Sequence, residues 1–371
     1  MWHEIHSFLN LQSLLLTLFF LCLLVQLYFQ VRYFIPFALQ LKETDLSNEE
    51  IPLSVIIAAK NEAKGIVNTL ESIIQQDYEN FELILIDDHS ADETVPLAKA
   101  LNFPQLKIFS MPANQQGKKA AIQFGISQAK YEYLVFTDAD CLAKSPKWLK
   151  HIASHLKNNQ LVLGHSPFIK ESGLLNQLAR FENTQTALFY FSFAKQHKPY
   201  MGVGRNMAYH KGILSDELQL WNEEIKSGDD DLIVNRLGKK YKTAICTHVD
   251  SHTISRAETS WRSYFNQKRR QLQAGSYYAF SDKFRLYVVN LSKLYGWWLF
   301  IVLLSLQIQV SLILSIFVAM QMIQILVGIK SSKHLENRDL AWKWPLLEVV
   351  HLHWIGLVAF SSLIWKVDKW K

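Results

Sequence analysis

The sequence predicts an α/β domain built on a doubly wound sheet and held between membrane-spanning helices. Short runs rich in β-branched residues alternate with helical patterns between residues 50 and 285, and long uncharged stretches flank this segment on both sides. Apolar residues make up 49% of the 371-residue chain and charged residues 19%, which is too apolar for disorder and too charged for a pure membrane bundle. The chain therefore has room for one sizeable domain and several membrane segments.

The N-terminal segment, residues 1–35, is predicted to be a transmembrane anchor. Residues 5–31 contain no Asp, Glu, Lys or Arg, which is ample for a bilayer core of about 30 Å. The positive charges, Arg32 and Lys42, follow the apolar run instead of preceding it, unlike those of a signal peptide. We therefore expect an uncleaved helix with the following domain on the cytoplasmic side.

The domain begins with a regular alternation of strands and helices. Strands are predicted over 53–59, 81–86, 106–109 and 133–137, and helices over 62–76, 92–101 and 118–129. Polar clusters follow the strands: Asp87 to Ser90 after the second, and Asp138 with Asp140 after the fourth. In open α/β sheets ligands bind at the carboxyl ends of the strands, so these clusters mark the candidate site.

Asp138 and Asp140 are the strongest candidate metal ligands. Side chains alternate along an extended chain, so both carboxylates point to the same side while Ala139 points away. Hard oxygen ligands of this kind suit Mg²⁺ or Mn²⁺ bridging a diphosphate. The alternative is a loop whose aspartates cap the helix that starts near Ser145 and Pro146.

The region 286–371 is predicted to hold about three membrane helices. Residues 294–329 are uncharged, about 54 Å as a single helix, so we divide them into spans over 288–308 and 311–329. A further span is predicted over 344–365, although Glu348, His351 and His353 are unusual in hydrocarbon. Three lysines after this segment argue against the outside C-terminus that four spans imply, so the number of spans stays open.

Several motifs of the central domain occur in the order typical of one enzyme family. The chain resembles the membrane-bound family 2 glycosyltransferases with the GT-A fold, the group that contains cellulose, chitin and hyaluronan synthases and ceramide glucosyltransferases. The resemblance covers residues 53–275, and the flanking spans match the membrane-embedded members. The motifs are Ser54 to Glu62, Asp87 to Asp92, Gly117-Lys118, Asp138-Ala139-Asp140, Ser227 to Leu232, and Gln267 to Arg270, which is similar to the Q-x-x-R-W signature of processive members.

The resemblance implies a doubly wound mixed GT-A sheet and a set of site residues. It implies a base for inverting transfer in the aspartate run, with Asp230 preferred and Asp229 and Asp231 next, and a divalent cation, Mg²⁺ or Mn²⁺, on Asp138 and Asp140. The residues implied to bind the nucleotide-sugar are Ala58, Glu62, Asp88, Lys118, Asp138, Gln267 and Arg270.

Three positions depart from the family pattern. Gln271 replaces the signature Trp, which counts against stacking in a polymer tunnel and hence against processive synthesis. His89 stands where many members have Gly, and the run Asp229 to Asp231 replaces the usual Glu-Asp.

Other features have two open interpretations each. The aspartate run also suits a helix N-terminus, and Lys268 and Arg269 suit either the site or anionic lipid head groups. Residues 174–193 form either an interfacial helix or ordinary core. A short Gly-rich segment, 202–206, predicts a tight turn or a loop near the acceptor. Four metal-ligand types would share one face of an extended strand, although a solvated strand edge is the preferred interpretation: Cys246, His248, Asp250 and His252.

The functional prediction is an inverting glycosyltransferase that moves a sugar from a nucleotide-diphospho-sugar, a UDP-sugar above all, to a membrane lipid or lipid-linked acceptor. The alternatives are a processive polysaccharide synthase and a non-catalytic sugar-nucleotide-binding scaffold. Scattered Cys22, Cys141 and Cys246 exclude a disulfide framework and favour a reducing compartment. Positive charges beside the spans fit an inner leaflet better than nucleic acid. We therefore expect an integral protein of a bacterial-type inner membrane, with phospholipid as a partner and the catalytic domain in the cytoplasm.

Overall fold

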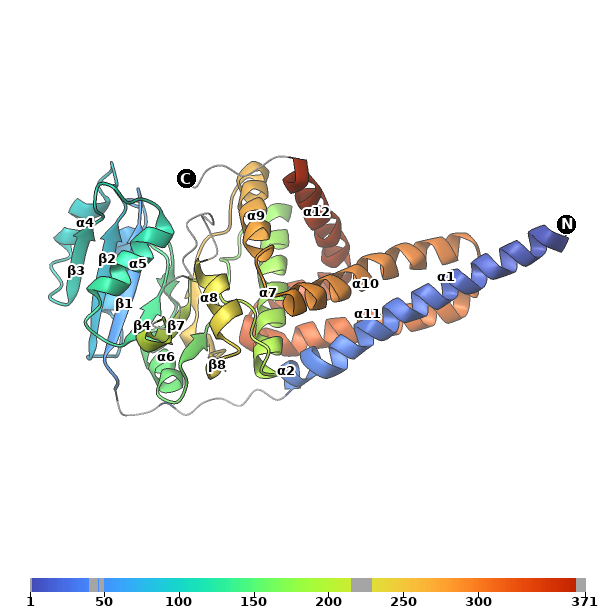
Figure 1. Cartoon of the computed structure of the whole chain (residues 1–371), viewed down its shortest axis with the longest axis horizontal. Coiled ribbons are helices and arrows are strands. Elements are labelled where there is room, and N and C mark those ends of the chain that lie inside the picture. The colour runs from blue at the N-terminus through green and yellow to red at the C-terminus, as the bar shows by residue number, and fades with distance from the viewer. Residues whose placement is uncertain (1, 40–45, 47–49, 215–228, 365–371) are drawn as a thin grey trace.

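The computed structural model describes residues 2–39, 46, 50–214 and 229–364. A sheet with its covering helices lies at one end of the molecule, and long helices extend from the other end (Figure 1). Two helices lie between these parts, α7 (Leu174–Lys195) and α9 (Trp261–Gly275).

The described residues form a mixed seven-stranded sheet in the order β3-β2-β1-β4-β7-β6-β8. The first four strands are parallel, β7 is antiparallel to both of its neighbours, and β6 pairs with β8 in parallel. This arrangement confirms the predicted doubly wound mixed sheet. The strands are β1 (Leu53–Ala59), β2 (Phe81–Asp87), β3 (Leu106–Ser110), β4 (Tyr133–Phe136), β6 (Leu161–Leu163), β7 (Met207–His210) and β8 (Thr243–Ile245). A second small sheet pairs β5 (Leu142–Ala143) with β9 (Thr253–Ile254).

Side chains of the sheet contribute to two hydrophobic cores. One core joins apolar side chains of β1, β2 and β4 to α3 (Ile66–Ile74) and α6 (Trp148–Leu156). The other contains side chains of α5 (Lys118–Gln128) and α7 and continues into the membrane helices. The sheet and the membrane region therefore share one continuous core. The remaining helices of the domain are α4 (Thr94–Ala100) and α8 (Asp229–Leu237).

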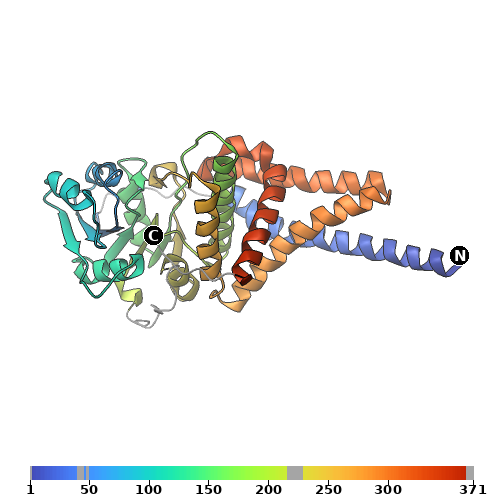
Figure 2. The same ribbon diagram turned by 90° about the horizontal axis from the view of Figure 1, so that it is seen from above.

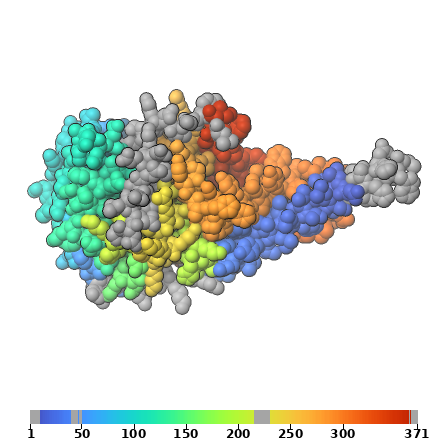
Figure 3. Space-filling view, in the orientation of Figure 1, coloured from blue at the N-terminus to red at the C-terminus, as the bar shows by residue number. Residues whose placement is uncertain are grey.

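Within the described ranges, four helical segments are long and apolar enough to cross a membrane: Asn10–Leu39, Phe280–Ser305, Val310–Leu335 and Arg338–Ser362. They contain α1 (Trp2–Phe29), a π-helical turn (Gln30–Phe34), α2 (Ile35–Leu39), α10 (Phe280–Ser305), α11 (Val310–Leu335), a 3₁₀ turn (Arg338–Lys343) and α12 (Trp344–Ile364). The long uncharged stretch is divided as predicted, but α10 begins before the expected domain boundary at 285. Figure 2 and the space-filling view in Figure 3 show α1, α10 and α11 extending well beyond the α/β domain.

Helix α7 belongs to the protein interior. Most of its side chains are buried, including Phe181, Tyr190 and Phe193, and it packs against β8, α2 and α12. Of the two interpretations of residues 174–193, the structure therefore confirms ordinary core packing.

Residues 246–252 do not form the predicted extended strand. The chain turns instead through a 3₁₀ turn, Val249–Ser251, in which the Ser251 N–H donates to His248 O at 2.9 Å and the Ser251 hydroxyl donates to the same carbonyl. The four expected metal-ligand types consequently do not share one face, and that prediction was wrong.

Candidate active site

A buried carboxylate follows β2 at the edge where the parallel strands end. Asp88 is 1% exposed, and its Oδ2 atom accepts the Gly117 N–H at 3.0 Å and the Lys60 ammonium at 3.4 Å. Gly117 has a φ of 100°, a conformation that glycine adopts without strain. The structure therefore brings three of the sequence motifs into contact around Asp88, beside the carboxyl end of β1 where Ala58 lies.

The loops after β1 and β2 hold each other in place. The Asn61 N–H donates to Ser90 Oγ at 2.9 Å, and the Ala91 N–H returns a bond to Asn61 Oδ1 at 2.8 Å. The Glu62 N–H donates to Thr94 Oγ1 at 2.8 Å. Because these bonds use backbone donors on both loops, the predicted nucleotide-contacting backbone around Glu62 is rigidly placed.

The next residue after Asp88 has an unusual backbone conformation. His89 has a φ of 57°, in the left-handed region, and its Nδ1 lies 3.3 Å from Asp88 Oδ1. A left-handed conformation explains why glycine suits this position. The backbone at this position therefore explains the glycine of many family members, and His89 adopts the same left-handed φ with a side chain.

The two aspartates after β4 come together as predicted. Asp138, Asp140 and Cys141 each place a ligand atom within 4.8 Å of the others. Asp138 Oδ1 accepts the Lys118 ammonium at 2.6 Å. Partial desolvation, and then the charge of Asp138, raise the pKa of Asp140 above its ordinary value, although the side chain remains exposed on one side and Arg205 and Lys118 oppose the shift. Two carboxylates that repel each other in this way fit a divalent cation with a preference for oxygen ligands.

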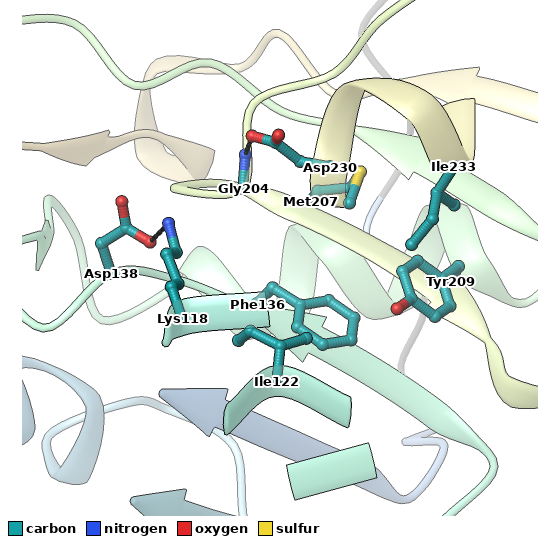
Figure 4. A pocket seen from close by; sticks show the side chains of 9 residues that line it. All are labelled: Lys118, Ile122, Phe136, Asp138, Gly204, Met207, Tyr209, Asp230 and Ile233. Atoms are coloured by element: carbon teal, nitrogen blue, oxygen red, sulfur yellow. Dashed lines mark hydrogen bonds and ion pairs between the residues drawn. The ribbon is translucent and has the colours of Figure 1, made fainter. Parts of the chain in front are cut away.

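Asp138 and Asp230 line the same pocket (Figure 4). Asp230 comes from the first turn of α8, and its Oδ2 accepts the Gly204 N–H at 2.5 Å. In the close-up, the Lys118–Asp138 pair and the Asp230–Gly204 pair lie on neighbouring sides of the pocket. The lining residues are Lys118, Ile122, Phe136, Asp138, Gly204, Met207, Tyr209, Asp230 and Ile233.

Asp231, which follows Asp230 in the sequence, is not among the described residues that line the pocket. Asp231 Oδ2 accepts the Tyr278 hydroxyl at 2.7 Å, and burial followed by the Asp231 charge raises the pKa of Tyr278 far above its ordinary value. Asp229 begins α8, but its side chain lies outside the described part of the chain, as does the motif start at Ser227 and Gly228. Asp231 is therefore held by a tyrosine, whereas Asp230 lines the pocket.

Helix α9 carries Gln267 and Arg270 and packs against α8 and α12. Neither residue is among those that line the pocket of Asp138 and Asp230. Lys268 has a third role that the sequence did not suggest. Its ammonium lies 3.0 Å from Glu182 Oε1 in a mostly buried ion pair, and Glu182 also accepts the Tyr264 hydroxyl. Lys268 is therefore buried in an ion pair and is not among the residues that line this pocket.

Two site residues, Arg205 and Asn206, were underestimated from the sequence. The Arg205 guanidinium donates to Ser255 Oγ at 2.8 Å and lies over the Phe168 ring at 4.5 Å, and its charge lowers the pKa of Asp140. Asn206 is fully buried and holds the adjacent loop by donating to the carbonyls of His165 and Ser251 at 2.7 and 2.8 Å. The only sequence signal was the weak Gly-rich segment 202–206.

A separate histidine cluster lies beside α6. The rings of His151 and His248 stack with centroids 4.3 Å apart, and Asp250 completes a group of possible metal ligands. Burial and the neighbouring His248 lower the pKa of His151 to about 4. However, His248 Nδ1 already accepts the Asp250 N–H at 3.1 Å. Since that bond occupies the lone pair of a neutral imidazole, the cluster is explained as a turn packed on α6.

The mixed sheet, with acidic residues at the edge where β2 and β4 end, is typical of the GT-A fold. The comparisons with known proteins agree with this fold. Residues 54–218 match the family model described as "Glycosyl transferase family 2". This part of the chain is therefore similar in sequence to a family 2 glycosyltransferase domain.

Two curated relatives illustrate the match in sequence. Poly-beta-1,6-N-acetyl-D-glucosamine synthase of Staphylococcus aureus is 28% identical over 144 residues, which cover 38% of this chain and 35% of that protein. The match therefore spans about a third of the length of that relative. An uncharacterized glycosyltransferase of Haemophilus influenzae is 26% identical over 251 residues, 59% of this chain and 76% of that protein.

A solved structure illustrates the match in fold. The mannosyltransferase PcManGT from Pyrobaculum calidifontis, solved in complex with GDP-Man and Mn²⁺, superposes with a TM-score of 0.62 and 15% identity. The superposition covers 96% of this chain and all of that one, 100%. At this identity the likeness establishes the shared fold, which includes the region of the long helices.

Proposed function

We propose that the protein is an inverting transferase that moves a sugar from a nucleotide-diphospho-sugar, with a UDP-sugar as the expected donor, to a membrane lipid or a lipid-linked acceptor. The observation that carries the proposal is the pocket itself. Asp138 and Lys118, which follow β4 and begin α5 respectively, line it together with Asp230 from the first turn of α8. A diphosphate and a proton acceptor on opposite sides of the sugar are what an inverting displacement requires.

In this mechanism Asp230 takes the proton from the acceptor hydroxyl. The hydroxyl oxygen then forms its bond to the anomeric carbon while the bond from that carbon to the diphosphate oxygen breaks, and the nucleoside diphosphate leaves with the electron pair. The Gly204 N–H, which donates to Asp230 Oδ2, orients the carboxylate. Asp230 is the proposed base in preference to Asp231, because the Tyr278 hydroxyl already binds Asp231.

Asp138 and Asp140 are the residues that would hold Mg²⁺ or Mn²⁺. Such a cation neutralises the charge that develops on a leaving diphosphate. Lys118 lies 2.6 Å from Asp138, so its ammonium is placed to contact the same diphosphate. Asp88, Ala58 and Glu62 surround the expected nucleotide position, and Gln267 and Arg270 are proposed to approach it from α9 when donor is bound.

The acceptor proposal follows from the helices on both sides of the domain in the sequence. Residues 1–35 and 286–371 are proposed as membrane regions around the catalytic unit of residues 50–285. A membrane-held cleft reaches a lipid hydroxyl without extraction from the bilayer, which raises the effective concentration of the acceptor. We propose a bacterial-type inner membrane with the catalytic domain in the cytoplasm, because Arg32 and the lysines near the other helices favour that orientation.

A processive polysaccharide synthase is the second candidate. The Staphylococcus aureus relative, named as a poly-beta-1,6-N-acetyl-D-glucosamine synthase, favours it. Gln271 in place of the signature Trp, and the small number of candidate spans, favour transfer of single sugars. Product length distinguishes the two candidates directly.

The test is the release of nucleoside diphosphate by the full-length protein in detergent. UDP-glucose, UDP-galactose, UDP-GlcNAc and GDP-mannose are screened with total membrane lipid and with Mn²⁺ or Mg²⁺. We expect turnover with one donor, dependent on lipid and metal, and a labelled lipid product with a single added sugar. A ladder of longer products would establish the processive alternative.

Variants then assign the residues. Asp230→Asn is expected to abolish transfer while donor binding persists, and Asp140→Asn is expected to weaken metal-dependent donor binding as well. Asp250→Asn, an acid on the 3₁₀ turn outside the pocket, is the matched control and should retain activity. Loss of activity in Asp231→Asn with retention in Asp230→Asn would move the base to Asp231. Donor binding without turnover in every lipid extract would favour the non-catalytic scaffold, and no donor binding would contradict the proposal.

A further inference from the structure

The last long helix runs in a different direction from the other three. In Figures 1 and 2, α1, α10 and α11 follow the long axis of the molecule. Helix α12 runs across that axis in both views, alongside α7 and α9, and it packs against both of them. Because α7 and α9 belong to the glycosyltransferase domain, α12 runs in the same direction as two helices of that domain. It does not run along the bundle formed by α1, α10 and α11.

A polar layer connects α12 to the bundle and fixes its depth. The Lys293 ammonium on α10 lies 2.7 Å from Glu348 Oε1 on α12, and both side chains are buried. The end of the Gln324 side chain on α11 lies 3.1 Å from the same carboxylate, and it donates to Glu348 when the amide nitrogen is assigned to that side.

The layer lies near the middle of α10 and α11. From Lys293 to the end of α10 at Ser305 is about 18 Å of helix, and from the start of α11 at Val310 to Gln324 is about 21 Å. Both distances are shorter than a hydrocarbon core of about 30 Å. With the turn between α10 and α11 at the far boundary of the bilayer, the layer and the Glu348 end of α12 lie in the half of the bilayer next to the domain.

The exposed side of α12 is apolar and forms one stripe. The large exposed side chains follow a spacing of seven, four, three and four residues, which is one face of a helix: Leu346, His353, Leu357, Phe360 and Ile364. Ala359 is exposed beside them. The opposite face buries Glu348 and His351 against the protein. An apolar groove of about 540 Å³ also runs along α12, where Trp261 and Trp354 are among its lining residues. One lipid-facing stripe on a helix whose other side is docked on a protein domain suits the head-group boundary.

The charges after α12 agree with this placement. Lys366, Lys369 and Lys371 follow the helix in the sequence. If α12 crossed the bilayer, these lysines would be on the side opposite the domain, against the positive-inside tendency. If α12 lies in the membrane plane, they stay on the side of the domain with the other basic residues.

We infer that α12 does not cross the membrane. It lies in the plane of the leaflet that faces the glycosyltransferase domain, so that three helices span the bilayer and the residues after α12 are on the same side as that domain. The exposed stripe contacts the lipids of that leaflet, at the boundary between their head groups and acyl chains. Hydropathy alone counts α12 as a fourth candidate span.

Depth measurements test the inference in liposomes of phosphatidylcholine and phosphatidylglycerol. Nitroxide labels are placed on single cysteines at Leu346 and Phe360 of α12, in full-length protein whose native cysteines are replaced by alanine. Both side chains are more than 60% exposed, at 69% and 63%, so labelling leaves the core intact. The matched pair is Leu312 and Leu326 on α11, which has the same separation and is also exposed.

Fourteen residues of helix correspond to about 21 Å. We expect the α11 pair to differ in depth by nearly that amount and the α12 pair to differ by no more than about 5 Å. A difference within the α12 pair that matches that of the α11 pair would overturn the inference.

Sidedness gives an independent measurement in intact cells. A membrane-impermeant maleimide is applied to full-length proteins with one cysteine at Gln307 in the far turn, at Asn158 in the domain, or after Lys371. We expect labelling at Gln307 alone, with the other two labelled only after the cells are opened. Labelling of the cysteine after Lys371 together with Gln307 would show four spans. Both measurements are independent of donor and acceptor, so their outcome is separate from that of the proposed function.

Discussion

Removing one partner of the buried ion pair between α10 and α12 should destabilise the fold far more than replacing both partners with apolar residues. Lys293 is 4% exposed and Glu348 0%, and their charged atoms are 2.7 Å apart. With an effective dielectric constant of about 20, the gross attraction at this distance is about 6 kcal/mol, most of which offsets the cost of removing both charges from water. Glu348→Gln leaves an uncompensated ammonium beside the Phe189 ring, and Lys293→Met leaves an uncompensated carboxylate.

We therefore expect each single variant to lower the free energy of unfolding by about 3–5 kcal/mol. The double variant Lys293→Met, Glu348→Met buries no charge and should lie within about 1 kcal/mol of the wild type. The pairwise coupling derived from this cycle is then larger than either net effect. Lys170→Met is the control, because Lys170 forms an exposed pair with Asp339 at 3.1 Å and should cost less than about 1 kcal/mol.

The assay is denaturant unfolding in detergent micelles, followed by tryptophan fluorescence. Single variants that cost no more than the Lys170 control would refute the reasoning, because the pair would then be accessible to water. A double variant that costs the sum of the two singles would refute it in another way, since the two side chains would be stabilising the fold independently.

Three further outcomes are expected from denaturant titrations and calorimetry. Although burial raises it, hydrogen bonds from His252 and Lys144 lower the pKa of Glu336 to about 2. Its stabilisation, about 2–3 kcal/mol, is thus present above pH about 4.5 and lost as the pH falls towards about 2, and Glu336→Gln should remove that part of the pH dependence. Asn206→Ala leaves two buried carbonyls and the indole N–H of Trp148 without their partner, so a loss of at least about 3 kcal/mol is expected. Gly117→Ala forces a side chain into a φ of 100° and should cost about 1–2 kcal/mol and weaken UDP binding, whereas unchanged calorimetric affinity would separate this turn from the nucleotide site.

The sequence predicted the parallel half of the sheet well because its signals are local. Each of the first four strands is a short apolar run followed by a polar cluster, and the observed strands end within a residue or so of the predicted positions. The meeting of Asp88 with Gly117, and of Asp138 with Lys118, follows from strand order once the carboxyl ends share one edge. These contacts required no information about distant pairing.

The rest of the fold depends on interactions that sequence periodicity does not contain. Strand β7 is four residues long and pairs antiparallel with β4, from which it is about seventy residues distant in the chain. For the same reason, the sequence could not predict what Lys268 on α9 contacts. Whether Lys268 faces lipid or an ion pair depends on Glu182, a residue of another helix. Likewise, hydropathy gives the length of α12 but not its direction.

The membrane region also completes the surface of the glycosyltransferase domain. Glu336 follows α11 directly, and its carboxylate contacts Lys144 at 2.5 Å and His252 at 2.8 Å, residues next to the paired strands β5 and β9. Glu336 has a φ of 60°, a left-handed conformation that costs a non-glycine residue about 1 kcal/mol or more. Such a conformation persists only where surrounding contacts determine it. Because β5 begins two residues after Asp140, the end of a membrane helix is tied to the loop that carries the candidate metal ligands. The position of the bundle and the geometry of the site are therefore coupled, and the unit of residues 50–285 has an incomplete surface without the chain that follows α11.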